Sequence, residues 1–307
     1  MREVIIIGSG PAGYTAGIYT ARAGLNPLLI ASSVEAGGEL MKTTEVENYP
    51  GFPNGLQGPE LMDAFRAQAE RFGTEVLLDD VIEVDLKGKT KIVKTGNGKT
   101  FEAKAVILAT GAAYRELGLP KEKELSGYGI SWCATCDGFF FREKTIAVVG
   151  GGDSAMEEAN FLTRFASKVY LIHRRDSFKA SKIMQDRALN NPKIEVIWNS
   201  EVAELKGEDR LNGVVLKSTV DGSTSDLALD GLFIAIGNDP RVWLVKDQVE
   251  LTPEQFIKVE GRSSKTTLPG VFAAGDVIDP TYRQAITAAG SGCVAALDAE
   301  HYLTDLE

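Results

Sequence analysis

Cysteine is scarce in this chain: its 307 residues include three. Three cysteines cannot form a framework that stabilises a chain of this size, so any disulfide is expected to be catalytic rather than structural. Long apolar runs are also missing, and stretches such as Val4–Ile7 and Ala105–Ala109 are far too short to span a bilayer. Met1 and Arg2 lead directly into a strand-like run, without the apolar segment or cleavage site of a signal peptide. These features predict a cytoplasmic protein.

Positive charge is in deficit. The formal net charge is -10, which argues against nucleic acid or an anionic membrane as partner, because both repel an acidic surface. The composition is otherwise that of a globular protein, with 44% hydrophobic and 25% charged residues. The length is sufficient for two compact domains.

A strand, glycine turn, helix and strand follow one another near the start of the chain. The apolar run Val4–Ile7 leads into the turn, a helix-compatible stretch continues to Gly24, and a second apolar run follows at Pro27–Ile30. The turn has the pattern G-x-G-x-x-G and consists of Gly8, Ser9, Gly10, Pro11, Ala12 and Gly13. In this pattern the first glycine makes the tight turn, the second admits a pyrophosphate and the third permits close packing of helix and strand. The helix N-terminus then offers free N–H groups to the phosphates.

The same pattern recurs in the middle of the chain. Ile146–Val149 leads into a second turn, and a helical stretch and the strand Val169–Ile172 follow. This second turn consists of Gly150, Gly151, Gly152, Asp153, Ser154 and Ala155. Each unit also has a later apolar strand that ends in glycine, Ala105–Gly111 and Leu232–Gly237. A single such turn can be an ordinary strand–helix corner, but two in matching contexts predict an α/β protein with two Rossmann-like dinucleotide-binding domains.

Basic residues follow the second strand of the second unit. They are His173, Arg174 and Arg175, with Lys179 four residues further on. An acidic residue here would favour NAD by bonding the ribose 2′-hydroxyl, whereas arginines accommodate a 2′-phosphate. The alternative is the solvated basic start of a helix. The location favours an NADPH site.

The first unit lacks an acidic residue at the equivalent point. Ser32 and Ser33 occupy it, and Glu35 is the nearest carboxylate. Its ligand is instead indicated by Gly270–Asp276, an apolar strand that ends in Gly275-Asp276. A carboxylate placed there can bind a polyol such as the ribityl chain of a flavin. We therefore expect FAD at the first site.

Cys133 and Cys136 form a C-x-x-C motif between these halves. This spacing permits a disulfide and lowers a thiol pKa, as in redox pairs. The alternative is a structural zinc site. Such a site needs four ligands, and the remaining candidates, Cys293, His173 and His301, form no second close pair. We therefore expect no metal. Asp137 is placed to hold the proton that a leaving thiolate needs, or alternatively to cap the following turn.

These segments together resemble low-molecular-weight thioredoxin reductases over the whole chain. The resemblance is carried by Gly8–Gly13, Gly37–Leu40, Glu45–Gly51, Cys133–Gly138, Gly150–Ala155, His173–Ala180, Ala273–Val277 and Tyr282–Ala285. The glycine turns are shared with many flavoproteins, whereas the Cys-Ala-Thr-Cys-Asp segment in this position is far more specific.

The resemblance implies a discontinuous FAD domain, residues 1–113 and 244–307, with an NADPH domain inserted at 114–243 that carries the redox pair. Besides Gly8–Gly13, the FAD-binding positions would be Glu35, Gly37, Gly38, Glu39, Leu40, Asn48, Thr110, Gly111, Gly275, Asp276, Arg283, Gln284 and Ala285. Cys136 would meet the flavin and Cys133 would attack the partner disulfide. Phe139 and Phe140 match a surface used by thioredoxin, although two neighbouring phenylalanines are equally typical of a core.

The resemblance further implies a homodimer in which the NADPH domain rotates against the FAD domain, with a hinge near residues 112–117 and 239–244. Rotation would let the cysteine pair reach the flavin and then a bulky protein disulfide in turn. Three positions depart from the family pattern: Glu39 replaces a common glutamine, Lys179 a usual arginine and Asn238 a frequent histidine. None of the three removes a required chemical group.

Three rivals of other classes remain. A ferredoxin–NADP reductase of this architecture needs no cysteine pair, and a small-molecule dithiol oxidase needs no NADPH. A dinucleotide-sensing binding protein would not turn over. The sequence favours NADPH-dependent reduction of thioredoxin.

Overall fold

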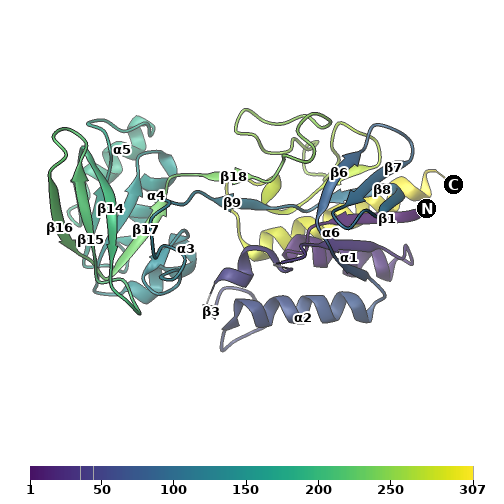
Figure 1. Cartoon of the computed structure of the whole chain (residues 1–307), viewed down its shortest axis with the longest axis horizontal. Helices are drawn as coiled ribbons and strands as arrows, with labels where there is room; N and C mark the ends of the chain where they lie inside the picture. The colour runs from purple at the N-terminus through teal and green to yellow at the C-terminus, as the bar shows by residue number, and fades with distance from the viewer. Residues whose placement is uncertain (35, 44, 307) are drawn as a thin grey trace. The chain divides into compact units, whose positions relative to one another are not determined.

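The computed structural model describes residues 1–34, 36–43 and 45–306. The chain divides into two compact units (Figure 1). One consists of Met1–Ala113 and Asp239–Glu307, and the other of Tyr114–Asn238. The chain passes between them in β9 (Ala112–Tyr114) and β18 (Asn238–Pro240), which pair as a two-stranded sheet. The first unit is therefore assembled from two separate parts of the sequence.

The first unit is built on a sheet with the order β5-β2-β1-β8-β7-β6, in which β19 also pairs with β8. β1 is parallel to β2 and β8, and β19 is parallel to β8, whereas β6 and β7 are antiparallel. The strands of this sheet are β1 (Arg2–Ile7), β2 (Leu28–Ala31), β5 (Glu75–Leu78), β6 (Val81–Asp85), β7 (Lys91–Thr95), β8 (Thr100–Leu108) and β19 (Val271–Ala273). The other elements are α1 (Pro11–Arg22), η1 (Gly38–Lys42), β3 (Glu45–Val46), β4 (Leu56–Gln57), α2 (Gly58–Arg71), η3 (Gly275–Val277) and α6 (Ala285–Thr304).

The apolar run of β1 is continuous because the sheet is covered on both faces. Val4 and Ile6 pack into a core with residues of α1, α2 and α6. Ile5 and Ile7 point the other way, into a second core with β6, β7 and apolar residues of 242–259. Successive strand side chains alternate between faces, so a strand in a middle layer needs apolar residues at every position.

The second unit repeats this plan. Its parallel sheet has the order β10-β17-β11-β12-β13. The strands of this sheet are β10 (Ile130–Ser131), β11 (Thr145–Gly150), β12 (Lys168–Ile172), β13 (Ile194–Ile197) and β17 (Gly231–Ala235). The other elements are α3 (Ala134–Asp137), η2 (Gly138–Phe141), α4 (Asp153–Leu162), α5 (Lys182–Leu189) and the antiparallel strands β14 (Ser200–Lys206), β15 (Gly213–Ser218) and β16 (Thr224–Ala228).

Both faces of this second sheet are also covered. Ile146 and Val148 of β11 pack with α4, and Ala147 and Val149 pack with β14 and β15. β11 lies between β12 and β17, as β1 lies between β2 and β8. The strand order reverses at these positions, which is where doubly wound sheets bind nucleotides, at the carboxyl ends of the strands. The predicted fold class, α/β with two Rossmann-like units, is confirmed.

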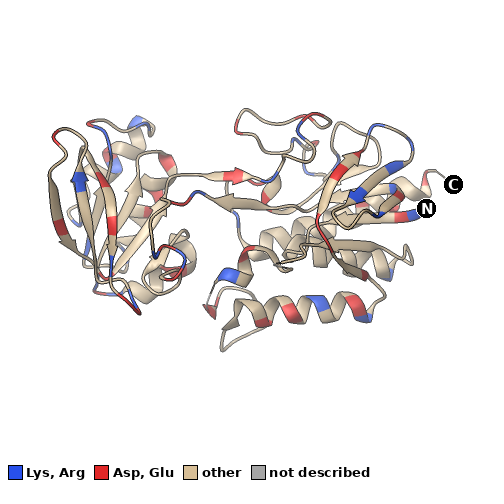
Figure 2. Cartoon of the chain, viewed as in Figure 1, with Lys and Arg blue, Asp and Glu red and all other residues tan. Residues whose placement is uncertain are grey.

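Acidic and basic residues occur along the ribbon of both units (Figure 2). No helix among residues 1–34, 36–43 and 45–306 has the length and apolar character needed to cross a membrane.

Candidate functional site

In both turns the first glycine lies close to the neighbouring strand. A side chain on Gly8, which has φ 110°, would place its Cβ 2.1 Å from the Ala109 oxygen, and one on Gly150 would lie 2.4 Å from the Ala235 oxygen. In each unit the first glycine therefore lies against the end of the neighbouring parallel strand. Gly13 is equally constrained, since its Cβ would lie 2.0 Å from the Gly8 oxygen.

The middle glycine of each turn is different. A Cβ on Gly10 or Gly152 would meet no protein atom within 4 Å. Protein packing therefore does not require glycine at either position, whereas close approach of a phosphate does. Gly10 and Gly152 are also the N-caps of α1 and α4, and neither helix has a side-chain cap. Both turns thus present backbone N–H groups at a helix N-terminus and fit a dinucleotide pyrophosphate.

The other predicted FAD residues gather around the first turn. Ser9 Oγ accepts a hydrogen bond from Gly37 N at 2.9 Å, and a Cβ on Gly38 would lie 3.3 Å from Gly10 Cα. These contacts bring η1, which contains Glu39 and Leu40, against the turn. A Cβ on Gly275 would lie 2.9 Å from Ala12 Cβ, so η3 approaches the start of α1.

The C-terminal segment joins the same cluster. Asn48 Nδ2 donates to Gln284 Oε1 at 3.3 Å, and Gln284 is the N-cap of α6, which begins at Ala285. Arg283 adopts φ 49° while its N–H donates to Asp279 Oδ2 at 2.9 Å. Burial, followed by the charge of Asp279, raises the pKa of Asp276 to about 6. Glu35 lies outside the described residues.

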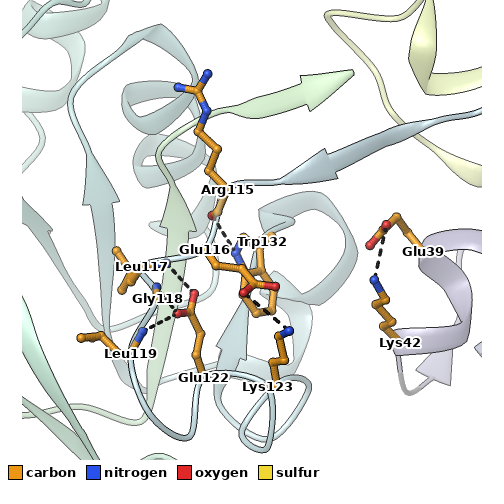
Figure 3. Close-up of polar contacts among 10 residues, drawn as sticks. All are labelled: Glu39, Lys42, Arg115, Glu116, Leu117, Gly118, Leu119, Glu122, Lys123 and Trp132. Atoms are coloured by element: carbon orange, nitrogen blue, oxygen red, sulfur yellow. Dashed lines mark hydrogen bonds and ion pairs between the residues drawn. The ribbon is translucent and has the colours of Figure 1, made fainter. Parts of the chain in front are cut away.

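Sequence reasoning missed Arg241, which connects two parts of this cluster. Its side chain pairs with Glu39. Glu39 Oε1 also lies 3.8 Å from Lys42 Nζ (Figure 3). Its backbone oxygen accepts from Thr110 Oγ1 at 2.8 Å, and its N–H donates to the Gly111 oxygen at 2.9 Å. The replacement of a common glutamine by Glu39 was the available signal, because a carboxylate at a partly buried position calls for a cation.

The two cysteines of the motif form a disulfide in the second unit. Cys133 and Cys136 have Cα atoms 5.3 Å apart, because Cys133 is the N-cap of the short helix α3 and Cys136 lies within that helix. Cys136 is exposed and Cys133 is half-buried. Burial raises the pKa of Asp137, while a hydrogen bond of 2.6 Å from Ser131 Oγ opposes that rise. Asp137 can therefore retain a proton at a higher pH than an exposed carboxyl group, beside the disulfide.

Phe139 and Phe140 lie next to the disulfide and are 50% and 38% exposed. The alternative that they belong to the core is wrong, and Phe141 is the member of this run that is buried. Arg142 covers Phe139 at 4.3 Å from the ring centroid. An exposed aromatic pair beside a redox disulfide is a suitable contact surface for another protein.

Trp132 fixes the backbone on the N-terminal side of the disulfide. Its Nε1 donates to the Arg115 oxygen at 3.3 Å (Figure 3). Its ring stacks on Tyr114 with centroids 6.4 Å apart. The next turn is organised by Glu122, a carboxylate 2% exposed that sequence reasoning also missed. It accepts hydrogen bonds from the backbone N–H groups of Leu117, Gly118 and Leu119 at 2.8, 2.8 and 3.1 Å (Figure 3).

The predicted NADPH residues meet at the second turn, but in two different environments. Arg174, Arg175 and Lys179 are exposed after β12, so their charges are accessible to a phosphate. His173 is buried and its ring contacts backbone oxygens instead. The loop is attached to the turn because Lys179 N donates to the Gly151 oxygen at 2.8 Å. Within the described residues no group of three or more His, Cys, Asp or Glu side chains is arranged to hold a metal ion.

Comparisons with known proteins agree with this arrangement. Residues 2–292 match a family model described as pyridine nucleotide-disulphide oxidoreductase. The chain is 61% identical over 306 residues to a thioredoxin reductase of Streptomyces clavuligerus, covering 100% of this chain and 95% of that protein. It is 59% identical over 305 residues to a thioredoxin reductase of Mycolicibacterium smegmatis, covering 99% and 97%. The structure of thioredoxin reductase from Giardia duodenalis is 42% identical, with 99% of each chain covered and a TM-score of 0.94.

Proposed function

The chain belongs to the pyridine nucleotide-disulphide oxidoreductase family, and on that premise we propose that it is a thioredoxin reductase. It takes electrons from NADPH, passes them through FAD to the Cys133–Cys136 disulfide and delivers them to the disulfide of thioredoxin. The observation that carries this proposal is the Cys133–Cys136 disulfide, which lies in the same unit as a dinucleotide turn. A ferredoxin–NADP reductase would not need this disulfide, and a dithiol oxidase would not need the basic loop beside the turn.

We assign FAD to the first unit and NADPH to the second. The assignment of FAD is supported by the cluster of η1, η3 and the start of α6 around the Gly8–Gly13 turn. That of NADPH is supported by three exposed cations beside the Gly150–Ala155 turn. Bound FAD supplies a chemistry that side chains lack, because it converts a hydride into electrons that can enter a disulfide.

The cysteine chemistry proceeds by exchange. Two electrons break the Cys133–Cys136 bond and leave a thiolate on each sulfur, and Asp137 gives its proton to the thiolate of Cys136. The Cys133 thiolate then attacks one sulfur of the thioredoxin disulfide, which forms a mixed disulfide and releases a thioredoxin thiolate. Cys136 returns its proton to Asp137 and attacks the Cys133 sulfur of the mixed disulfide, which re-forms the Cys133–Cys136 bond and releases the second thioredoxin thiolate.

Phe139 and Phe140 are the proposed contact surface for thioredoxin, since both are exposed beside the disulfide. The two chain crossings, β9 and β18, are the proposed hinge between the units. We place the protein in the cytoplasm, where a reducing environment suits a chain with one disulfide and one further cysteine.

We also propose that the protein is a homodimer. Ile286, Val294 and Leu297 of α6 are 45%, 37% and 41% exposed, and their spacing places them on one helix face. Tyr19 of α1, which packs against α6, is 42% exposed. An apolar helix face of this kind suits a second copy of the chain.

The function is tested by anaerobic titration of the purified flavoprotein with NADPH, followed by oxidised thioredoxin. The wild type should take up two reducing equivalents beyond the flavin and pass them to thioredoxin. In the Cys136→Ser variant, NADPH should reduce the flavin and no disulfide. After oxidised thioredoxin is added, this variant should hold thioredoxin as a mixed disulfide at Cys133. If both proteins take up the same equivalents, or thioredoxin stays oxidised, the cysteines serve another acceptor.

A further inference from the structure

Ser131 places a buried hydroxyl group on an apolar face of the second sheet. It ends β10, is 3% exposed, and pairs in parallel register with Phe233 of β17. Its neighbour Ile130 packs into one core of this unit, whereas Phe233 packs into the other core together with Ala134 of α3. The Ser131 side chain therefore points to the side of the sheet on which α3 lies. A hydroxyl group buried there needs hydrogen-bond partners.

The hydroxyl group of Ser131 lies between the attacking cysteine and the proposed acid. Its oxygen accepts a hydrogen bond from Cys133 N at 3.0 Å and lies 2.6 Å from Asp137 Oδ2. The other acceptor within reach is the Cys133 carbonyl oxygen, at 3.4 Å. That oxygen already accepts from the backbone N–H groups of Cys136 and Asp137. Because a hydroxyl group has one proton to donate, the proton of Ser131 goes to Asp137 Oδ2, the nearer acceptor.

This hydrogen bond decides which oxygen of Asp137 carries the proton. In the described part of the chain, Ser131 is the one group that donates a hydrogen bond to the Asp137 carboxyl group. A proton on Oδ2 would face the hydroxyl proton of Ser131, whereas a proton on Oδ1 leaves the hydrogen bond intact. Neither bond of Ser131 involves a sulfur atom, so opening of the disulfide breaks neither of them.

Building on the proposed function, we infer that Ser131 is a positioning residue for proton transfer, which ties Asp137 to the backbone of Cys133 and keeps the transferable proton on Oδ1. After the disulfide is reduced, the Asp137 Oδ1–H bond breaks and an S–H bond forms at Cys136. The negative charge passes from the sulfur to the carboxylate, which the Ser131 hydroxyl stabilises by a charge-assisted hydrogen bond. Return of the proton from Cys136 to Asp137 reverses this transfer, so the same hydrogen bond serves both directions.

The first test is a double-mutant cycle on the holoenzyme, with NADPH as reductant and thioredoxin as acceptor. The rates are compared at a pH where Asp137 is protonated both in the wild type and in Ser131→Ala, so that a change of its pKa makes no contribution. Ser131→Ala should lower kcat by about tenfold, the worth of one orienting hydrogen bond, and leave KM for thioredoxin unchanged. The double variant Ser131→Ala/Asp137→Asn should be as slow as Asp137→Asn, because Ser131 acts through Asp137. A double variant that is slower still would overturn the inference.

Ser131→Thr separates the hydroxyl group from its packing. Threonine keeps the hydroxyl group and adds a methyl group at a buried position, so it should lower the temperature of thermal unfolding. Its kcat should nevertheless stay near that of the wild type. A threonine variant as slow as Ser131→Ala would assign the effect to packing and refute the role of the hydroxyl group. If the wild type leaves thioredoxin oxidised, it is the proposed function that fails, and the inference fails with it.

Infrared spectroscopy tests the hydrogen bond without thioredoxin. The difference spectrum between the oxidised and reduced holoenzyme should contain a carboxyl C=O band that is absent from Asp137→Asn. In Ser131→Ala this band should move to higher wavenumber, because a carbonyl group that loses a hydrogen-bond donor has a stiffer C=O bond. A band that stays in place would refute the inference even if the turnover rates of the variants are as expected.

Discussion

At the scale of single residues, two carboxyl groups, Asp137 beside the disulfide and Asp276 in the first unit, lie in low-polarity surroundings. Burial is the largest cause of the raised pKa of both. They differ in what opposes burial: a hydroxyl hydrogen bond at Asp137, and the charges of Arg283 and Arg241 at Asp276. The same physical effect therefore serves a proposed proton donor in one unit and a proposed cofactor ligand in the other.

Asp137→Asn should lower the rate of thioredoxin reduction by about 100-fold or more, the usual contribution of a general acid. Reduction of the flavin by NADPH should continue unchanged, and stopped-flow absorbance can separate the two steps. Wild-type activity should decline as pH rises through the raised pKa of Asp137.

Ser131→Ala is the matched control for that decline. The Ser131 hydroxyl lowers the pKa of Asp137, so its removal should move the decline to higher pH. In Asp137→Asn this limb of the profile should vanish. A limb that persists in the asparagine variant belongs to another group.

The raised pKa of Asp276 predicts that the stability of the FAD-free protein depends on pH. Its pKa rises from 3.8 to about 6 on folding, so the folded state keeps a proton that the unfolded chain has lost. The free energy of unfolding should therefore fall as pH rises from about 4 to 6, by at most about 3 kcal/mol. In urea denaturation, the unfolding free energy of Asp276→Asn should not fall over this pH range. An equal fall in both proteins would show that another group causes it.

At the scale of elements, the repeated strand–turn–helix unit separates glycines needed for folding from those needed for binding. Gly150 is in close contact with the end of β17, while Gly152 begins α4 with no neighbour that a methyl group would touch. The two positions lie two residues apart, yet their substitution should have different effects.

Gly152→Ala should fold with nearly wild-type stability and lose affinity for NADPH by tenfold or more, because a methyl group displaces the phosphate. Gly150→Ala should lose about 2 kcal/mol or more of stability, since its Cβ would lie 2.4 Å from the Ala235 oxygen. Thermal unfolding and fluorescence titration measure the two effects. Equal destabilisation by both substitutions would contradict this division.

The sequence predicted the elements that carry local patterns. The apolar runs of β1 and β11 and the turns after them lie as expected, because strand burial and glycine spacing are local properties. Long-range pairings were not predictable. Arg241 pairs with Glu39, 202 positions away, so no local pattern marks it. The contacts of Glu122 are local, to backbone N–H groups three to five residues before it, but a single glutamate in a loop has no periodic pattern that would predict them. His173 was predicted as a ligand from its position next to Arg174, whereas its burial depends on Phe178 and Trp198.

At the scale of the whole molecule, the proposed homodimer gives a direct prediction. Leu297→Glu places a charge in the exposed apolar face of α6 and should convert the dimer into a monomer. Light scattering coupled to size exclusion measures the mass. Leu189→Glu, at a residue of α5 that is 48% exposed in the other unit, is the matched control and should leave the dimer intact. A wild-type protein that elutes as a monomer would refute the proposal.

The divided sequence of the first unit also bears on its biosynthesis. β19 supplies the parallel partner for Val106, Ile107 and Leu108 of β8, and α6 covers α1, yet both elements are made after the whole second unit. The contiguous second unit can fold on the ribosome while this part of β8 still lacks β19. The nascent chain thus carries an open strand edge and an apolar helix face until β19 and α6 have been translated. Ribosome stalling before residue 271 should therefore yield a folded central unit on a chain that depends on chaperones to remain dispersed.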